Sequence, residues 1–421
     1  MWGICYAEAQ VSGETILLTA PLSLDGESDV TYRAPNLIRR IVSIFKNVRP
    51  GSDLTRFQAR APPSLIYLFN NNLILLIGLW RLWMTLLELL MLPPLFNMPK
   101  SQLQCYGETV YCVGNDMLSR CSKAESSLER FASVVAWSIS TTRPLIFGVA
   151  PFNPILGETH HVSKGTLNVL LEQVSHHPPV SALHATDEKE NIEMIWCQYP
   201  VPKFYGASVE AEVHGNRQLR LLKLGENYEM NSPRLLIRFL PVSSADWVGT
   251  VRIRCRETGL EAELCYRGSS FLGRRSNYRS IKGKIFESSS SKTIYEIDGH
   301  WDRTVSMKDI NNGKLSIIYN AKEMLSGLKT PTVKDPKGVW PSESAVVWGE
   351  VSQGIMNKDW EKAKAAKTAI EEKEREGLRE RKSRGETWVP KHFKLFSGKE
   401  GGWDCLPIQD LVPPAPIALP L

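Results

Sequence analysis

The chain has 421 residues, of which 43% are hydrophobic, so it can bury one large core or two ordinary ones. Its formal net charge of +6 is modest, and the basic residues are spread along the chain. This argues against nucleic acid as the main partner and is compatible with an anionic membrane surface or ligand. The eight cysteines show no Cys-x-x-Cys spacing and follow no signal peptide, so we expect reduced and mostly buried thiols in the cytosol.

The first 58 residues divide into two parts. Residues 1–35 mix Gly, Ser, Asp and Glu with short apolar patches, and they predict a flexible leader. Residues 36–58 begin with an amphipathic helix over Asn36 to Val48, where apolar residues recur at helical spacing against basic ones. Such a helix either packs on a core or, because basic and apolar faces suit a bilayer interface, closes a pocket as a lid and touches membrane.

The segment 59–91 differs from the rest of the chain. From Leu73 to Leu92 it is dominated by Leu and Ile, with Arg81 and Glu88 as the charged residues. Its length matches a bilayer span of about 20 residues. A dozen Leu and Ile at about −0.5 kcal/mol each offset a central charge that costs about 3 kcal/mol. A membrane segment and a buried or lid helix are both compatible with this segment.

Residues 92–421 predict one large domain. A helix over Ser126 to Ser140 has an apolar face, and from Phe147 to about Tyr319 short apolar runs alternate with turn residues at intervals of roughly 8 to 12 residues. Nine or more strands form an antiparallel sheet that is too large to stay flat, and closure into a barrel can enclose a ligand cavity. The predicted strands are Leu167–Val174, Glu193–Gln198, Ser208–Val213, Leu219–Leu224, Leu235–Leu240, Thr250–Arg254, Glu261–Tyr266, Ile281–Phe286 and Thr293–Ile297.

The most informative stretch runs from Leu171 to Pro179. Two prolines end it and stiffen the turn, so His176 and His177 are presented at the end of a strand. An imidazole pair held this way can donate to an anion, bind a metal or carry protons. A metal site would need further ligands, and His184 is a poor third one. Hydrolysis would need a nucleophile elbow, and Ser175 lacks the Gly-x-Ser-x-Gly setting.

The C-terminal part begins with a highly charged helix from Trp360 to Arg384. Most of it reads as a solvent-exposed face with pairs at i and i+4. Lys367, Glu371 and Arg375 lie at i, i+4 and i+8 and therefore share one face. From Pro390 onward we expect an aromatic- and proline-rich tail along the surface.

The octet Glu-Gln-Val-Ser-His-His-Pro-Pro at residues 172–179 resembles the fingerprint of the oxysterol-binding-protein-related family of lipid transfer proteins. Supporting blocks stand in family order around it: Asn-Pro-Ile-Leu-Gly-Glu at 153–158, Gly-His-Trp at 299–301, and the helix from Trp360. The resemblance covers roughly Asn36 to Pro390 with one interruption, and it is closest to short plant members that lack a pleckstrin-homology domain. It implies an α+β fold, with a large antiparallel β-barrel that encloses a lipid tunnel, N-terminal lid helices and a C-terminal helical region.

The resemblance also implies the residues of a lipid headgroup site. In the family, the charged helix supplies a Lys and an Arg that bind phosphate and a Glu that holds them in place. The corresponding set, with the histidine pair and the asparagine of the Pro-x-Asn-Pro block, is His176, His177, Asn153, Lys367, Glu371 and Arg375. No metal and no cofactor is implied.

Two positions depart from the family pattern. The family has Lys directly before the Pro-x-Asn-Pro block, where this chain has Ala150, and it has Gln before the helix arginine, where this chain has Glu374. The loss of one charge-assisted contact could weaken phosphate affinity by about 1.5–3 kcal/mol. In family members, moreover, a segment like 49–58 runs almost directly into one like 92–100. Segment 59–91 therefore has a third interpretation, as intronic sequence retained in the gene model.

We therefore expect a non-enzymatic protein that binds sterol, with its hydroxyl inward, or phosphatidylinositol 4-phosphate in the tunnel and transfers it between membranes. It would work in the cytoplasm, in peripheral contact with membranes. A bilayer and an apolar tunnel solvate a lipid tail almost equally, so the polar end decides specificity. One alternative is a lipid sensor that signals occupancy to protein partners without net transfer. Another is an esterase that uses Ser175 and a histidine.

Overall fold

The computed structural model describes residues 7–11, 14–24, 94–113, 117–239, 243–268, 278–398 and 401–420. The helix predicted at Asn36 to Val48 and the insertion 59–91 lie outside these ranges. Within the described ranges, every helix is too short or too polar to cross a bilayer. Each of the seven described cysteines is a free thiol, and five of them are buried.

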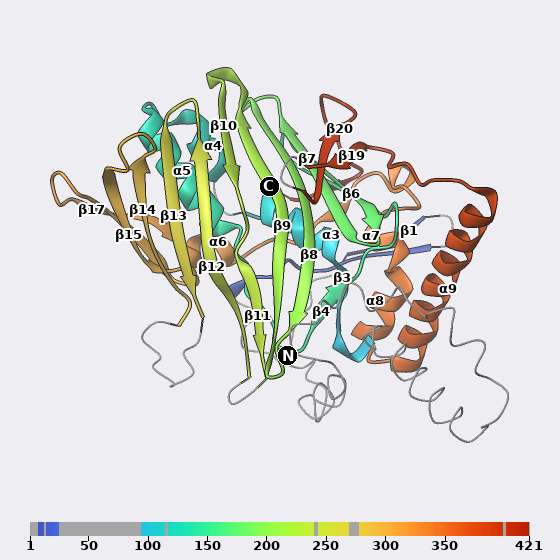
Figure 1. Ribbon diagram of the computed structural model, residues 1–421. Coiled ribbons are helices and arrows are strands. Elements are labelled where there is room, and N and C mark those ends of the chain that lie inside the picture. The colour runs from blue at the N-terminus through green and yellow to red at the C-terminus, as the bar shows by residue number, and fades with distance from the viewer. Residues whose placement is uncertain are drawn as a thin grey trace.

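A 15-stranded sheet forms the body of the molecule (Figure 1). Neighbouring strands run antiparallel along the path from β5 to β17, and β21 adds to β5 in parallel. The strands are β5 (Thr159–Lys164), β6 (Leu167–His176), β7 (Pro179–Asp187), β8 (Ile192–Phe204), β9 (Ser208–Leu221), β10 (Glu226–Met230), β11 (Arg234–Arg238), β12 (Ser244–Cys255), β13 (Leu260–Arg267), β14 (Ser280–Glu287), β15 (Thr293–His300), β16 (Thr304–Asp309), β17 (Leu315–Asn320), β18 (Thr332–Val333) and β21 (Ile417–Ala418).

The helices of the first half lie on the concave side of this sheet, behind the strands in Figure 1. They are α3 (Gln102–Tyr111), α4 (Met117–Lys123) and α5 (Ser127–Ser140), and a fourth short helix, α6 (Ala321–Leu325), follows β17. One buried cluster unites side chains of these helices with side chains of strands from β5 to β17. The sheet therefore wraps around its helices as a barrel, which confirms the predicted α+β fold with one large antiparallel β-barrel.

Alternation of buried and exposed residues explains why these segments form strands. In β13, Leu260, Ala262, Leu264 and Tyr266 face the core, and their neighbours face outward. One predicted boundary was wrong: the segments 208–213 and 219–224 were predicted as two strands, but β9 runs unbroken from Ser208 to Leu221, and Gly215 lies in the predicted gap. This glycine has φ +97° and lies inside β9, where a Cβ would come within 1.9 Å of the Cys197 carbonyl oxygen. The glycine marks a close approach of two strands and not a turn.

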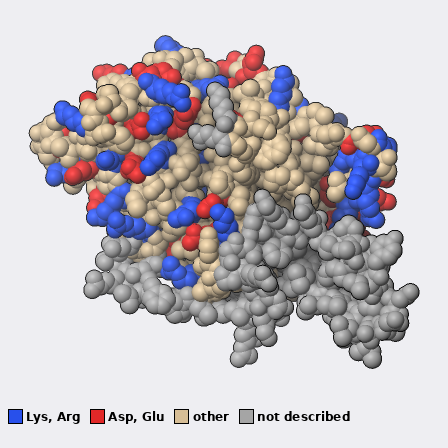
Figure 2. All heavy atoms as spheres, in the orientation of Figure 1, with Lys and Arg blue, Asp and Glu red and all other residues tan. Residues whose placement is uncertain are grey.

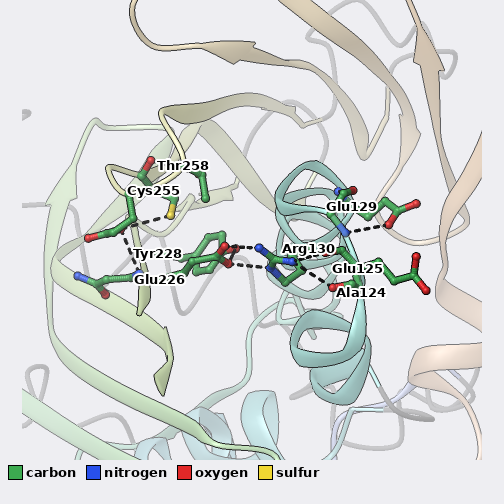
Figure 3. Close-up of polar contacts among 11 residues, drawn as sticks. Ala124, Glu125, Glu129, Arg130, Glu226, Tyr228, Cys255 and Thr258 are labelled. Atoms are coloured by element: carbon green, nitrogen blue, oxygen red, sulfur yellow. Dashed lines mark hydrogen bonds and ion pairs between the residues drawn. The ribbon is translucent and has the colours of Figure 1, made fainter. Parts of the chain in front are cut away.

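An ion pair in the core ties α5 to β10 (Figure 3). The Arg130 guanidinium donates to both carboxylate oxygens of Glu226, with Nε at 2.9 Å, and the Tyr228 hydroxyl donates to the same carboxylate at 2.6 Å. Arg130 also donates to the carbonyls of Ala124 and Glu125, which directly precede its own helix. A buried pair with this many hydrogen bonds fixes one helix against one strand.

The N-terminal part corrects the prediction of a flexible leader over residues 1–35. Strands β1 (Ala7–Val11) and β2 (Glu14–Leu18) form an antiparallel hairpin, and Ile16, Leu17 and Leu18 are at most 3% exposed. The prediction was wrong for residues 14–24, because this apolar triplet is buried against helices α7 (Ser344–Val347) and α8 (Gly349–Met356).

The C-terminal part contains the predicted charged helix with the expected bounds, α9 (Trp360–Arg384). Asp359 caps its first turn, and Gly385 ends it in the left-handed conformation with φ +66°. Figure 2 shows basic and acidic side chains gathered over α9, at the right edge of the view. We had expected the tail to lie along the surface, but it forms strands of its own. Strands β19 (Phe393–Ser397) and β20 (Trp403–Pro407) form a hairpin that covers the outer face of β6 to β8, and the chain ends in β21 of the main sheet.

Candidate functional site

A short strand, β4 (Ala150–Phe152), is the element that the candidate site is built on. It pairs in parallel with β3 (Asn97–Ser101), and the buried Asn97 side chain strengthens the pairing. The Asn97 amide donates to the Ala150 carbonyl at 3.2 Å and to the Pro151 carbonyl at 3.5 Å. Its Oδ1 accepts a hydrogen bond from Lys367 Nζ at 2.8 Å. One buried amide therefore connects the lysine of α9 to the strand that opens the Pro-x-Asn-Pro block.

The histidine pair is attached to the same block two residues further on. His176 Nδ1 lies 2.9 Å from the carbonyl oxygen of Pro154, and the ring centroids of His176 and His177 are 4.6 Å apart. Asn153, the neighbour of Pro154, is exposed at this place. Asn97, which accepts a hydrogen bond from Lys367, and His176 therefore both hydrogen-bond to backbone carbonyls of segment 150–154, and Asn153 lies between these two attachment points.

Both imidazoles are neutral near pH 7. Burial lowers the pKa of His176 to about 4, with a further contribution from His177, and partial burial also lowers the pKa of His177. Because the Pro154 carbonyl can only accept a hydrogen bond, Nδ1 of His176 carries the ring proton. Its Nε2 is therefore a hydrogen-bond acceptor in this state, and it becomes a donor only when the ring takes up a second proton.

The face of α9 that was predicted to bind phosphate carries three charged residues that interact with one another, Lys367, Glu371 and Arg375. Burial lowers the pKa of Lys367, and Glu371 opposes this shift. Burial also raises the pKa of Glu371, while Lys367 and Arg375 act to lower it, so the carboxylate interacts with both cations. Arg375 is exposed at the outer end of the face. With two cations and one carboxylate, the face has a net charge of +1 near neutral pH.

Two acidic residues of the family blocks hold the scaffold of the site. Glu158 is fully buried and accepts hydrogen bonds from Ser344 Oγ at 2.7 Å, Trp348 Nε1 at 2.8 Å and the Ile155 amide at 3.0 Å. It therefore fastens the loop 153–158 to helices α7 and α8. Glu172 accepts the backbone N–H groups of residues 391 and 392, each at 2.8 Å, and so anchors the C-terminal segment to β6.

A pocket of about 750 Å³ lies beside the candidate site, on a neighbouring face of α9. Its lining includes Ile155, Trp340, Ile370, Lys373 and Glu374, and it includes none of the six predicted headgroup residues. Glu374, which stands where the family pattern has glutamine, is one of these lining residues, and burial raises its pKa. No group of three or more His, Cys, Asp or Glu side chains is placed to hold a metal ion anywhere in the described ranges.

Asn97 is the residue that sequence reasoning missed. It stands 270 positions before Lys367 and belongs to no block of the resemblance, so its partner could be identified only from the pairing of β3 with β4.

Comparisons with known proteins agree with this architecture. Residues 85–350 match the family model described as oxysterol-binding protein. The chain is 53% identical to oxysterol-binding protein-related protein 4C of Arabidopsis thaliana over 410 residues, which are 96% of this chain and 99% of that protein. It is 30% identical to oxysterol-binding protein-related protein 8 of Homo sapiens over 367 residues, which are 84% of this chain and 37% of that protein.

Two solved structures share the fold. The Osh1 ORD domain in complex with cholesterol superposes with a TM-score of 0.66 at 20% identity and covers 91% of this chain and 87% of its own. The Osh3 ORD from Saccharomyces cerevisiae in complex with PI(4)P superposes with a TM-score of 0.58 at 20% identity and covers 75% of this chain and 85% of its own. The sequence matches and the barrel together show that the chain belongs to the oxysterol-binding protein family.

Proposed function

We propose that this protein is a non-enzymatic lipid carrier that takes up a sterol or phosphatidylinositol 4-phosphate in its barrel and moves it between membranes. The apolar part of the lipid would lie in the barrel interior. The phosphate of the phosphoinositide would bind at the mouth formed by segment 150–154 and α9. The protein would work in the cytoplasm and touch each membrane only peripherally.

The convergence of Lys367 and His176 on one segment carries this proposal. Lys367 is held by Asn97, which bonds to the carbonyl of Ala150, and His176 is held by the carbonyl of Pro154. Lys367 and His176 are far apart in the sequence, but the two carbonyls to which they are attached, those of Ala150 and Pro154, are only four positions apart. A phosphate placed between them would meet the Lys367 ammonium group and the His176 imidazole, whose Nε2 would have to take up a proton to donate to the phosphate.

Each residue of the predicted site then has a role. Lys367 would supply a point charge, and Arg375 would supply a planar guanidinium that can donate two parallel hydrogen bonds to phosphate. Glu371 would hold the two cations in register, because it interacts with both. The exposed Asn153 amide and the His177 ring would complete the contacts to the headgroup.

Ala150 bears on the affinity of this site. A lysine is missing there, and the backbone carbonyl of Ala150 accepts the Asn97 amide. The α9 face alone has a net charge of +1, so it only partly neutralises a phosphate of nearly two negative charges. We expect moderate affinity for a phosphoinositide, which suits a carrier that must also release its cargo.

The energetics favour carriage over catalysis. Burying a dozen methylenes gains on the order of 10 kcal/mol against water but little against the bilayer that the lipid left. Extraction is therefore nearly balanced, and the polar contacts at the mouth decide which lipid is taken. The related Osh1 ORD domain was solved in complex with cholesterol and with ergosterol, and the Osh3 ORD in complex with PI(4)P, which supports the same two lipid classes here.

The test is to purify the full chain from cells and to identify the bound lipids by native mass spectrometry. Extraction of phosphatidylinositol 4-phosphate and of a sterol from liposomes is measured in parallel. We expect at least one of these lipids in stoichiometric complex, and transfer of it to acceptor liposomes. Binding without transfer would indicate the lipid sensor. Binding of neither lipid would refute the proposal. Labelling by a serine-reactive probe that is lost in Ser175→Ala would instead indicate the esterase.

A further inference from the structure

A buried arginine lies in the barrel interior, far from the mouth. Arg217 is 5% exposed and stands on β9 on the same face as the core residue Leu219. Its guanidinium carbon is 4.1 Å from the ring centroid of Trp196 and 5.9 Å from that of Trp137, a residue of α5. Its Nη2 donates to Thr141 Oγ1 at 3.1 Å, where α5 ends.

Arg217 differs from the other buried arginines in having no strong acceptor. Arg130 has the Glu226 carboxylate and Arg143 has the backbone carbonyls of residues 108 and 112, and the partly buried Arg279 has the Asp302 carboxylate. In the described part of the chain, no carboxylate hydrogen-bonds to Arg217, and its Nε is buried without a partner. The helix end and the tryptophan rings offset only part of the cost of burying this charge.

Further donors without an acceptor lie in the same cluster. The indole N–H groups of Trp137 and Trp196 are buried and have no hydrogen-bond partner. Burial lowers the pKa of Arg217 to about 10, so the group still carries its charge near neutral pH. Buried polar groups are normally paired, and an unpaired donor is a place where a ligand or a water is expected.

The position of Arg217 is set by the strand register. Arg217 pairs with Trp196, Trp196 with Leu183, and Leu183 with Leu171, which precedes His176 by five residues on β6. Five residues along a strand and three steps across the sheet separate Arg217 from the mouth by roughly 20 Å. A ligand about 20 Å long with its outer end at the histidines would therefore reach Arg217 with its inner end.

We propose that the inner end of the barrel is an anion subsite, in which Arg217 selects lipids that present a carboxylate inward, such as a long-chain or polycyclic carboxylic acid. This rests on the proposed function, because it uses the same barrel interior. A carboxylate supplies the missing counter-charge and two acceptor oxygens, which can bond to Arg217 and to a neighbouring N–H group. A hydroxyl supplies one acceptor and no charge, so it satisfies the cluster less well.

The experiment compares an acid and an alcohol with the same hydrocarbon chain. The affinities of the delipidated full chain for oleic acid and for oleyl alcohol are measured near neutral pH by competition with a fluorescent lipid. We expect the wild type to bind the acid about tenfold more tightly than the alcohol. Arg217→Gln should lose this preference while it keeps alcohol binding, and Arg217→Lys should restore part of it.

A matched control is available on the same strand. Arg220 points to the outer face of β9, where it bonds to Glu193 and Gln218, so Arg220→Gln should keep the wild-type preference for the acid. An equal affinity of the wild type for acid and alcohol would overturn the proposal, and this result does not depend on any variant folding. An unchanged preference in a folded Arg217→Gln protein would overturn it as well. If the wild type transfers phosphatidylinositol 4-phosphate but shows no preference for the acid, only the anion subsite fails, and the carrier function stands.

Discussion

Replacement of Asn97 by leucine tests how the mouth of the barrel is organised. The buried Asn97 amide holds Lys367 Nζ at 2.8 Å, so the lysine is already ordered before a phosphate arrives. In Asn97→Leu the ammonium would have to be immobilised on binding, at a cost of about 0.5–1.5 kcal/mol. This corresponds to phosphoinositide affinity that is roughly 2- to 13-fold weaker. Removal of the ammonium itself in Lys367→Ala should cost about 1.5–3 kcal/mol.

A double-mutant cycle distinguishes positioning from a general structural effect. Affinity for a soluble short-chain phosphatidylinositol 4-phosphate is measured by calorimetry for the wild type, for each single variant and for the double variant. If Asn97 acts through Lys367, then Asn97→Leu should have almost no further effect in the Lys367→Ala background. Lys364→Ala, on the exposed side of α9, is the control and should bind like the wild type. An equal loss of affinity from Asn97→Leu in both backgrounds would refute the reasoning.

Three further predictions concern the histidines and the core. Changing His176 and His177 together to Ala should abolish extraction of phosphatidylinositol 4-phosphate from liposomes and leave sterol binding intact. Changing the exposed Lys373 to Ala should do almost nothing. Equal losses of extraction in the two proteins would mean that the face of α9 assigned to the site is wrong. Phosphoinositide affinity should rise as pH falls from 7 toward 5.5. The free His176 has a pKa of about 4, a bound phosphate raises it, and the complex therefore takes up a proton; calorimetry in buffers of different ionisation enthalpy detects this uptake, and affinity that does not change with pH would contradict it. Glu226→Gln should lower the unfolding free energy by about 3–5 kcal/mol, because it leaves a buried guanidinium without its counter-charge. Glu229→Gln is the control, on the same strand but in a loose surface pair, and it should lower the unfolding free energy by less than about 1 kcal/mol. Both values are measured by chemical denaturation. Similar losses for the two variants would show that the buried counter-charge is not the cause.

Patterns with a local cause could be predicted from the sequence. Period-two burial identified β13 and its neighbours, and the run of charges between Asp359 and Gly385 gave α9 its correct bounds. The family blocks predict that His176 and Lys367 share one site, which stays a prediction; in the structure His176 bonds to the Pro154 carbonyl, and Lys367 bonds to Asn97, which bonds to the Ala150 carbonyl. These features depend on residues that are close in sequence or on blocks that are intact.

Features that depend on distant partners could not be predicted. The segment 7–18 resembles a leader by composition, and the burial of its residues 16–18 depends on helices that lie more than 300 positions away. Gly215 looks like a turn until β8 is placed against it, and after Pro390 the β19–β20 hairpin packs on β6 to β8 while β21 pairs with β5. Asn97 and Arg217 are ordinary residues in the sequence, and only the packing shows that one holds a lysine and that the other is buried without an anion.

Direct transfer between two liposome populations tests the central proposal that this barrel carries lipid by its headgroup. Donor liposomes contain phosphatidylinositol 4-phosphate, acceptor liposomes contain none, and a fluorescent phosphoinositide-binding domain reports its arrival. The wild type should accelerate transfer in proportion to its concentration, and the protein with both His176 and His177 changed to Ala should not. Transfer at the same rate by both proteins, or by neither, would contradict a carrier that selects its cargo at this mouth.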